Sequence, residues 1–449
     1  MKAKNHCSLL IENCSTILPD HSIFHNGSIA IDQNIIIEIG KTDEMSLKYS
    51  SDQTLDGKNK LALPGMTDCH THSVQQLLKG GTIDEPPIVW RRILVPYEAS
   101  MTSDDRYHAA LLYCIQSLRA GITMFADAGS MDMTGTLKAV HETGMSAVIS
   151  RVGRDMDDEL PSSMCDPDAK TSMKHQNELF DKHNGTNNGR IHIWYSLSSP
   201  MTTSENLARM VAEAANENNT GIHIHLGEHP AEVQTCLSRW AMRPPDFLDW
   251  CGVLGPNVIA AHCIQVTDFD LHLLAERGVH IIHCPTANLP TQGVPKLLSE
   301  RALKTNIALG NDGASSSKQD LLGQVQLLKY VTQAVYGTPV FESNVLPLEE
   351  AFDMCTINGA RALGVGNLRG SLEIGKQADI ILFDIDQPAF QPTRNLFKTF
   401  MMVAGSQDIT DVVMNGKIVI KNGSFTELDE EKIMYQGKQQ LQDLLYRSG

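Results

Sequence analysis

The chain has 449 residues, of which 42% are hydrophobic and 20% charged, and its formal net charge is −16. This composition is typical of a globular protein and predicts no disordered tail. The negative charge argues against nucleic acid or an anionic membrane as the main partner, because like charges repel. A small neutral or cationic substrate is the better expectation.

The length predicts two domains, because a single hydrophobic core stops growing at about 250–300 residues. The first residues lack the apolar core of a signal peptide, and no run approaches the roughly 18 apolar residues of a membrane span. The ten cysteines are scattered and form no Cys-x-x-Cys pair. We therefore expect reduced thiols and a cytoplasmic location.

The N-terminal segment 1–60 has the pattern of short strands. Its apolar, partly β-branched runs at 28–32 and 34–40 are separated by polar turns, which is typical of strands. This flank is too short to build a good core alone. It needs a partner from elsewhere in the chain.

The central segment 61–364 alternates short apolar runs with longer amphipathic ones as far as residue 312. This alternation predicts strand–helix units around a parallel sheet, with helices such as 104–120, 204–218 and 268–277. The eight expected strands are 61–72, 121–128, 145–151, 190–197, 221–226, 257–263, 279–284 and 305–311.

We therefore expect an α/β fold in which eight parallel strands close into a (β/α)8 TIM-type barrel. Active sites of such barrels lie at the C-terminal ends of the strands. The alternative is an open doubly wound sheet. It is less favoured because no Gly-x-Gly-x-x-Gly turn follows the first strand.

The C-terminal segment 365–449 returns to strand patterns, at 378–383 and 411–420. The second is a predicted hairpin with Asn415-Gly416 at its turn. We expect this segment to join residues 1–60 in one small β-domain beside the barrel. A helix is expected from Leu428 onward.

A pair of histidines, His70 and His72, closes the first expected strand. Side chains two residues apart on a strand project from the same face, so both rings can reach one ion. The pair alone is weak support, since roughly 0.6 such pairs arise by chance among 17 histidines in 449 residues. His225 and Asp312 lie at the ends of the fifth and eighth strands. These four residues are the expected ligands of one divalent metal with a position open for water, which is a catalytic arrangement.

Further polar residues surround the expected metal. His262 ends the sixth strand and would face the same cavity, with a satisfied core histidine as the alternative. Glu228 follows the fifth strand and can also reach the site. His283 ends the seventh strand and is either a substrate contact or a structural residue. His223 would lie one layer deeper and is expected to be a buried, hydrogen-bonded residue rather than a ligand.

Three cysteines, Cys69, Cys263 and Cys284, each adjoin one of these histidines. Neighbouring side chains of a strand point to opposite faces. We therefore expect the thiols to face the helix layer, with thiolate ligation as the alternative.

The assembled motifs resemble those of the amidohydrolase superfamily, in its branch of purine, pyrimidine and s-triazine deaminases and chlorohydrolases. The matching segments are 63–72, 77–81, 120–123, 225–228, 262–263, 283–288, 310–313 and, near the C-terminus, 370–379. The resemblance implies a mononuclear zinc or iron site, with zinc expected first, and a composite β-sandwich built from both termini. The implied ligands are His70, His72, His225 and Asp312, with Glu228 and His262 as catalytic partners. A two-metal site in such a barrel would need a carboxylated lysine, and the fourth strand has none.

The expected function is a metal-dependent hydrolytic deaminase acting on a small N-heterocycle such as a purine, pyrimidine, pterin or triazine. Glu228 would protonate the ring nitrogen while His262 and Asp312 hold or deprotonate the water. Trp90 and Asn288 would stack on and hydrogen-bond the ring. The alternatives are hydrolysis of a cyclic amide, displacement of chloride, or a non-catalytic scaffold. A homo-oligomer is expected.

Two departures from the nucleoside deaminases of this branch point away from a nucleoside. The loop after the fourth strand has Ser198 where those enzymes commonly have a histidine. Residues 87–90 lack the acidic residue that those enzymes place near a tryptophan to bind ribose. The loop at 183–190 is more similar to the triazine hydrolases.

Overall fold

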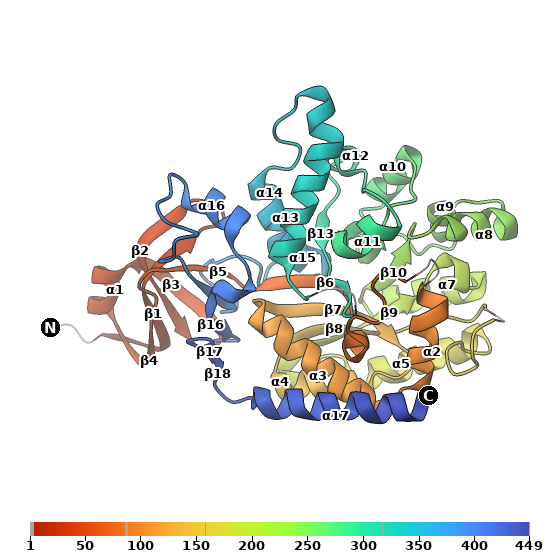
Figure 1. Cartoon of the computed structure of the whole chain (residues 1–449), viewed down its shortest axis with the longest axis horizontal. Coiled ribbons are helices and arrows are strands. Elements are labelled where there is room, and N and C mark those ends of the chain that lie inside the picture. Colours follow the sequence, from red (N-terminus) through yellow and green to blue (C-terminus); the bar gives the residue numbers. More distant parts are fainter. Residues whose placement is uncertain (1–3, 86–88, 158, 316–317, 449) are drawn as a thin grey trace.

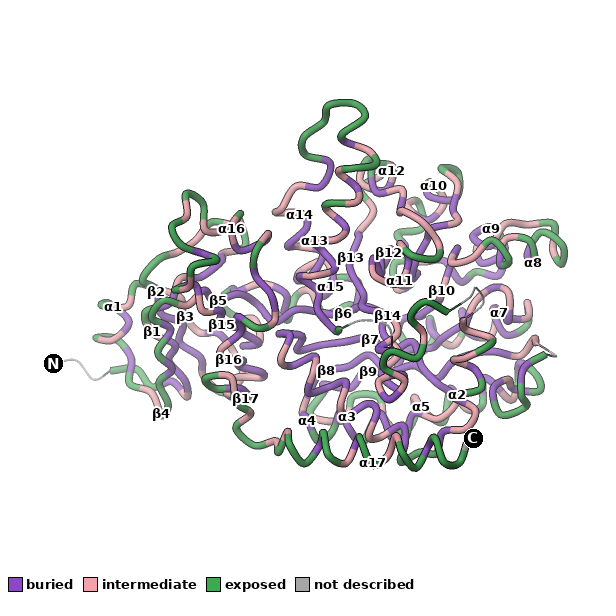
Figure 2. The backbone as a smooth tube through the Cα atoms, viewed as in Figure 1, coloured by how far each residue is buried: buried purple, intermediate pink, exposed green. Residues whose placement is uncertain are grey.

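We describe a computed structural model, which covers residues 4–85, 89–157, 159–315 and 318–448. The chain forms two sheets (Figure 1): one built from the chain termini, at the left of the view, and a parallel one inside the larger body at the right. Figure 2 shows the barrel strands as mostly buried tube, whereas the terminal sheet mixes buried residues with exposed ones on its outer strands.

The larger body is a closed barrel of parallel strands. Its strands are β6 (Met66–His72), β7 (Ile122–Ser130), β8 (Ser146–Arg151), β9 (Ile191–Leu197), β10 (Ile222–Leu226), β11 (Val258–His262), β12 (His280–His283), β13 (Ile307–Leu309) and β14 (Asp312–Gly313). Each strand from β6 to β13 pairs in parallel with the next one. The eighth strand is interrupted: β13 pairs with β12, while β14 pairs with β6 and closes the ring. The (β/α)8 prediction is confirmed.

Helices surround the barrel because the outward-facing side chains of its strands are apolar and pack against apolar helix faces. The larger helices are α3 (Ser103–Arg119), α4 (Thr134–Thr143), α5 (Ala169–His183), α7 (Glu205–Glu217), α8 (Pro230–Trp240), α9 (Pro244–Trp250), α10 (Asp268–Glu276), α13 (Leu321–Thr332) and α14 (Leu348–Cys355). Three of these, α3, α7 and α10, match the predicted helices closely. A capping box between Thr102 and Asp105 fixes the start of α3.

Shorter helical segments connect these elements. They are η1 (Ser73–Leu78), η2 (Trp90–Leu94), α2 (Val95–Ser100), α6 (Thr186–Gly189), η3 (Pro200–Thr202), α11 (Pro285–Thr291), α12 (Leu297–Ala302), η4 (Gln333–Gly337), η5 (Thr338–Val340), α15 (Ile357–Ala362), α16 (Leu396–Val403) and η6 (Ser406–Asp408). Among the described residues, no helix combines the length and apolarity that a membrane crossing requires.

The two ends of the chain share one mostly antiparallel sheet, as predicted. Its strands are β1 (Asn5–Ile17), β2 (Ile23–Asp32), β3 (Ile35–Lys41), β4 (Tyr49–Asp56), β5 (Lys60–Pro64), β15 (Ile380–Asp384), β16 (Ile409–Met414), β17 (Lys417–Lys421) and β18 (Ser424–Phe425), with α1 (Thr42–Lys48) beside them. The pairing of β5 with β15 joins the two ends. Ile11, Ile31, Ile380 and Val413 meet in a shared core, so neither end needs a core of its own.

The first predicted strand, 61–72, is two strands. β5 belongs to the terminal sheet and β6 to the barrel, and the chain passes from one to the other at Gly65. A Cβ at Gly65 would lie 2.2 Å from the hydroxyl oxygen of Thr123, so only glycine fits there. We propose a domain boundary at 64/65 rather than at 60/61.

The predicted C-terminal helix is α17 (Glu430–Ser448), and it packs on the barrel rather than on the terminal sheet. It runs along α3 at the bottom of Figure 1. The Asp105 carboxylate accepts hydrogen bonds from Gln440 at 2.7 Å and from Arg447 at 2.5 Å. The end of segment 365–449 therefore fastens the terminal sheet to the barrel.

Candidate metal centre and active site

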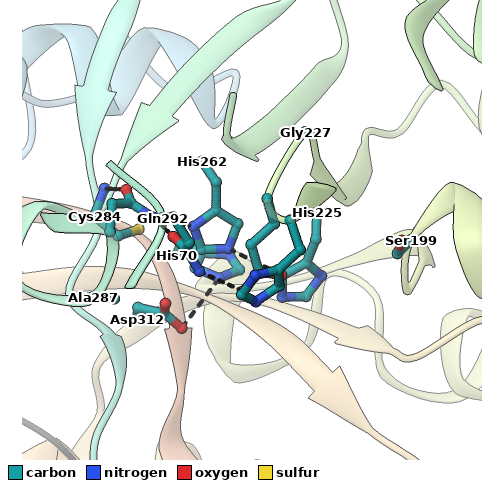
Figure 3. A network of polar contacts seen from close by, with 12 residues as sticks. His70, Ser199, His225, Gly227, His262, Cys284, Ala287, Gln292 and Asp312 are labelled. Carbon is teal, nitrogen blue, oxygen red and sulfur yellow. Dashed lines mark hydrogen bonds and ion pairs between the residues drawn. The ribbon is translucent and has the colours of Figure 1, made fainter. Parts of the chain in front are cut away.

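The four predicted ligands converge at the C-terminal ends of the barrel strands. Ring nitrogens of His70, His72 and His225 lie within 4.8 Å of one another. An oxygen of Asp312 lies 3.6 Å from Nε2 of His70 and 3.6 Å from Nε2 of His72. Figure 3 shows His70, His225, His262 and Asp312 gathered in one cluster.

The donor set fits a divalent metal. Nε2 of His70 is buried and has no hydrogen-bond partner within the described part of the chain. Nε2 of His72 lies 3.2 Å from Nε2 of His225, so two ring nitrogens face the same point. A buried nitrogen without a hydrogen-bond partner lowers the stability of the fold. A cation bound by three imidazoles and a carboxylate would remove this cost.

Burial favours the neutral form of two of these histidines, which is the form that binds a metal. Loss of solvent lowers the pKa of His70 to about 4 and the pKa of His225 well below its usual value. Burial alone would raise the pKa of Asp312, but the surrounding histidines, with His70 Nε2 3.6 Å from the carboxylate, lower it overall. His70 and His225 thus offer neutral nitrogens beside the Asp312 carboxylate.

Unusual backbone geometry presents two of these side chains. His262 and Asp312 have φ values of 78° and 59°, a left-handed conformation that non-glycine residues rarely adopt. The interrupted eighth strand also passes close to the first, because a Cβ at Gly310 would lie 2.7 Å from Cβ of His70. Such conformations are concentrated at functional sites.

A layer of hydrogen bonds orients the histidine rings. Nδ1 of His225 lies 2.7 Å from the carbonyl oxygen of Ser198, so it donates its proton there and turns Nε2 toward the cluster. Nδ1 of His70 lies 2.7 Å from Nε2 of His223. As expected, His223 is a buried hydrogen-bond partner, and its role is to orient His70.

Sequence reasoning missed Asp68, which is fully buried beneath the cluster. Its carboxylate accepts hydrogen bonds from the backbone N–H of His70 and from both the backbone and the side chain of Asn311. It therefore ties the first strand to the residue before Asp312. Alternation along the strand puts residues 68, 70 and 72 on one face, which is the signal that could have found it.

The two other catalytic candidates stand beside the metal cluster. Nε2 of His262 lies 3.9 Å from a carboxylate oxygen of Glu228, and this nitrogen has no partner within the described residues. The buried Glu232 accepts hydrogen bonds from the backbone N–H groups of Gly227 and Glu228. Glu232 thus fixes the loop that carries Glu228.

Two residues of the predicted substrate contacts have other partners. His283 faces the helix layer, where Nε2 lies 2.7 Å from the Glu300 carboxylate and Nδ1 lies 3.1 Å from the carbonyl oxygen of His262. The structure does not bring this ring into the cluster. The amide nitrogen of Asn288 lies 2.9 Å from Nδ1 of His262, so Asn288 contacts a catalytic candidate instead of open space.

The expectation for the cysteines holds for two and fails for the third. The Cys69 sulfur faces α15, since a Cβ at Gly359 would lie 3.1 Å from it, and Cys263 packs in an apolar cluster with residues of the surrounding helices. Cys284 brings its sulfur within 4.8 Å of ligand atoms of His70 and Asp312. Ile282 lies in register with Ala261 and His225, so it shares their inward face, and Cys284 two residues later faces inward as well.

Trp90 lies on the rim near the cluster, on η2. The Arg154 guanidinium lies 5.1 Å from the Trp90 ring and donates hydrogen bonds to the hydroxyl of Ser198. Glu98, eight residues after Trp90, is buried and accepts a hydrogen bond from Gln75. The sequence has no acidic residue near the tryptophan in the stretch 87–90, of which residues 87 and 88 lie outside the described residues. Glu98 supplies an acidic residue shortly after this stretch.

The arrangement is suited to hydrolysis. It combines three imidazoles and a carboxylate that fit a metal with two further groups that can hold or transfer protons.

Comparison with known proteins agrees with this description. A family model described as the amidohydrolase family matches residues 61–419. The chain is 31% identical over 446 residues to the 5-methylthioadenosine/S-adenosylhomocysteine deaminase of Thermoanaerobacter pseudethanolicus. The match covers 98% of this chain and 100% of that relative.

Solved structures share the fold. An adenosine deaminase from Xanthomonas campestris with bound zinc superposes with a TM-score of 0.91 at 24% identity, covering 99% of this chain and 100% of that one. The atrazine chlorohydrolase of Arthrobacter aurescens, also complexed with zinc, gives 0.88 at 21% identity and covers 96% and 100%. The converging ring nitrogens and carboxylate of this chain themselves fit a divalent metal at the cluster.

Proposed function

Since this chain belongs to the amidohydrolase family, we propose that it is a metal-dependent hydrolytic deaminase that removes the amino group of a small N-heterocycle. One observation carries the proposal: three buried or half-buried imidazoles and a carboxylate converge on one point, directly beside Glu228 and His262. A scaffold protein would have no need for this costly cluster of buried polar groups.

The metal would be held by His70, His72, His225 and Asp312, and zinc is the proposed ion, with iron as the alternative. When bound, such a metal supplies Lewis acidity that lowers the pKa of water from 15.7 to about 7. Neutral imidazoles suit both ions, whereas hard cations such as Mg²⁺ prefer oxygen ligands.

The protein's own residues would move the protons. Water adds to the ring carbon that carries the amino group, and Asp312 accepts the proton that this water loses. Glu228 delivers a proton to the adjacent ring nitrogen, which makes the carbon more electrophilic. The amino group takes the proton held by Asp312, the carbon–nitrogen bond breaks and ammonia leaves, while the hydroxyl on the ring carbon returns its proton to Glu228 as the carbonyl forms.

Adenine nucleosides altered at the 5′ position are the first substrate class to test. A full-length relative is named for two such compounds. The buried Glu98 carboxylate, close in sequence to Trp90, could accept hydrogen bonds from the two hydroxyls of a ribose. Ser198 still differs from the histidine common in nucleoside deaminases, so bases without ribose belong in the same panel.

The test is a substrate panel read for three products. Adenosine, 5′-methylthioadenosine, S-adenosylhomocysteine, guanine, cytosine, a pterin and an aminotriazine are incubated with zinc-loaded protein, and ammonia is measured. Chloride release from a chlorotriazine or ring opening of a cyclic amide, without ammonia from any amino compound, would favour the corresponding alternative hydrolase.

Glu228→Gln separates proton transfer from metal binding. Loss of a general acid typically lowers kcat by roughly 10²- to 10⁴-fold, while the metal content should stay unchanged because Glu228 is not a ligand. Unchanged turnover would remove Glu228 from the mechanism.

Two proposals concern the protein's context. We propose a cytoplasmic location, since nine of the ten cysteines are buried free thiols and the tenth is half-buried and also unpaired. We also propose a homo-oligomer, which size-exclusion chromatography with light scattering would test.

A further inference from the structure

One short helix contacts both proton-handling residues. From α11, Asn288 reaches Nδ1 of His262 at 2.9 Å. Gln292, one turn later, donates from Nε2 to the Glu228 carboxylate at 2.8 Å. Asn288 and Gln292 also hydrogen-bond to each other through the Asn288 amide nitrogen and the Gln292 side-chain oxygen. A continuous chain of side-chain hydrogen bonds therefore runs from His262 to Glu228.

Backbone groups fix the direction of this chain. The backbone N–H of Cys284 can only donate, and it points at the side-chain oxygen of Asn288 at 3.1 Å. The amide NH₂ of Asn288 must therefore lie on the opposite side, where its two hydrogens face His262 and Gln292. Gln292 then accepts with its oxygen and presents its own NH₂ to Glu228. Each group in the chain has one compatible orientation.

This direction determines the protonation of His262. Its Nδ1 faces a donor and must act as an acceptor, so the neutral ring carries its hydrogen on Nε2. That nitrogen is the one turned toward Glu228 and is buried without a partner in the described part of the chain.

We infer that Asn288 and Gln292 are a pair of positioning residues: Asn288 holds His262 as a hydrogen-bond donor through Nε2, and Gln292 holds Glu228 toward the substrate. His262 then steadies the attacking water or the oxygen that forms from it, and Asp312 is the proton acceptor. The inference deepens the proposed function and rests on it. It also reassigns Asn288, expected from the sequence as a substrate contact.

The anchoring of the pair suits this role. Asn288 is buried, with 1% of its surface exposed. The Gln265 side chain donates to the backbone carbonyl of Gln292 at 3.0 Å, and the backbone N–H of Gln292 donates to the carbonyl of Asn288 at 2.8 Å. The two side chains are thus held by a rigid turn, which lowers the entropy lost in aligning His262 and Glu228.

The decisive variant is Asn288→Asp, which keeps the shape and replaces the donor facing His262 with an acceptor. It should draw the His262 proton onto Nδ1 and leave Nε2 without one. The matched control is Asn306→Asp, because Asn306 makes the same kind of contact with Nδ1 of His280, at 3.0 Å, away from the site. Gln292→Met removes the link to Glu228 while keeping the side-chain length.

All variants are prepared as zinc-loaded full-length protein, with zinc content and melting temperature as checks. Asn288→Asp reverses the hydrogen bond to His262 and should lower kcat by roughly 10- to 100-fold. Gln292→Met removes the hydrogen bond to Glu228 and should lower kcat by about 5- to 10-fold, because both partners act in the transition state. KM should change by less than about 3-fold, since neither residue binds substrate. Asn306→Asp should keep the parent kcat.

A second measurement does not depend on activity. In zinc-loaded protein labelled with ¹⁵N-histidine, the His262 signals are identified by their loss in His262→Gln. Nδ1 should give the signal of an unprotonated nitrogen in the parent and of a protonated one in Asn288→Asp. Parent protein with a protonated Nδ1, or an Asn288→Asp variant with parental kcat, would overturn the inference. If the parent releases ammonia from no compound in the panel, the proposed function fails, while the spectrum still decides the state of His262.

Discussion

Replacing Asp68 by asparagine should destabilise the protein and weaken its metal site together. Each oxygen of the Asp68 carboxylate accepts two hydrogen bonds. One takes the backbone N–H groups of His70 at 3.2 Å and Asn311 at 3.0 Å. The other takes the Asn311 side chain at 2.8 Å and the Tyr113 hydroxyl at 3.1 Å. The side-chain amide of Asp68→Asn has one oxygen in place of two, so it can accept only one of these two pairs of hydrogen bonds.

The size of the effect follows from the donors left without an acceptor. If NH₂ replaces the oxygen that faces the two backbone N–H groups, two buried donors lose their acceptor. If it replaces the other oxygen, only the Asn311 side chain does, because the Tyr113 hydroxyl can accept instead. Each lost acceptor costs about 1–3 kcal/mol, so the expected loss in unfolding free energy is about 1–6 kcal/mol. For 449 residues, with an unfolding entropy near 2.1 cal/mol/K per residue, this corresponds to a fall in Tm of roughly 1–6 °C.

The assay is urea unfolding followed by circular dichroism, with the metal content measured in parallel. Work at pH 8 keeps the parent ionised, since burial raises the pKa of Asp68 to about 6. Tyr113→Phe is the control, because it deletes one of the four bonds, leaves no buried donor unpaired, and should cost about 1 kcal/mol. Metal affinity of Asp68→Asn should fall by roughly 10- to 100-fold, as for other groups that orient ligands. Parental unfolding and parental metal affinity would refute the reasoning.

Four other outcomes are expected. His225→Ala should release the metal, and full occupancy by elemental analysis would disprove this ligand assignment. The parent should hold metal at pH 6 and lose it as the pH falls toward about 4, where His70 becomes protonated. Equilibrium dialysis checks this, and complete loss already at pH 6 would contradict a neutral, buried His70. Cys284→Ser should retain its metal, since three imidazoles and a carboxylate suffice, whereas loss on dialysis would make the thiol a ligand. Trp90→Ala should raise KM more than it lowers kcat in steady-state kinetics, and the reverse would place Trp90 in the chemistry.

Strand alternation and the strand-end rule were enough to predict the fold and the metal cluster. His70 and His72 share a face because they are two residues apart, and the ends of parallel strands meet on one face of a barrel. These are local or topological facts, so they can be read from the order of residues. His225 and Asp312 needed nothing more than the positions of their strands.

The errors concern which face of one strand points inward. Ile282 lies in register with Ala261, and Ala261 with His225, so residues 282 and 284 take the inward face while His283 faces outward. The prediction assumed instead that His283 faces inward like the other strand-end histidines. Gln292 was invisible for a different reason: its contact with Glu228 joins residues 64 apart and exists only once α11 has docked.

The interrupted eighth strand makes metal binding a global event. Two of the proposed ligands lie on the first strand and one on the last, where Thr71 and Asp312, 241 residues apart, also share a hydrogen bond. A bound ion therefore acts as a cross-link that encloses nearly the whole barrel sequence in one loop. Only the folded barrel brings both ends of that loop together. The ion therefore stabilises the folded state by RT ln(1 + [M]/Kd). Removing the metal should lower the cooperativity of unfolding throughout the barrel, far beyond the strand ends that bind it.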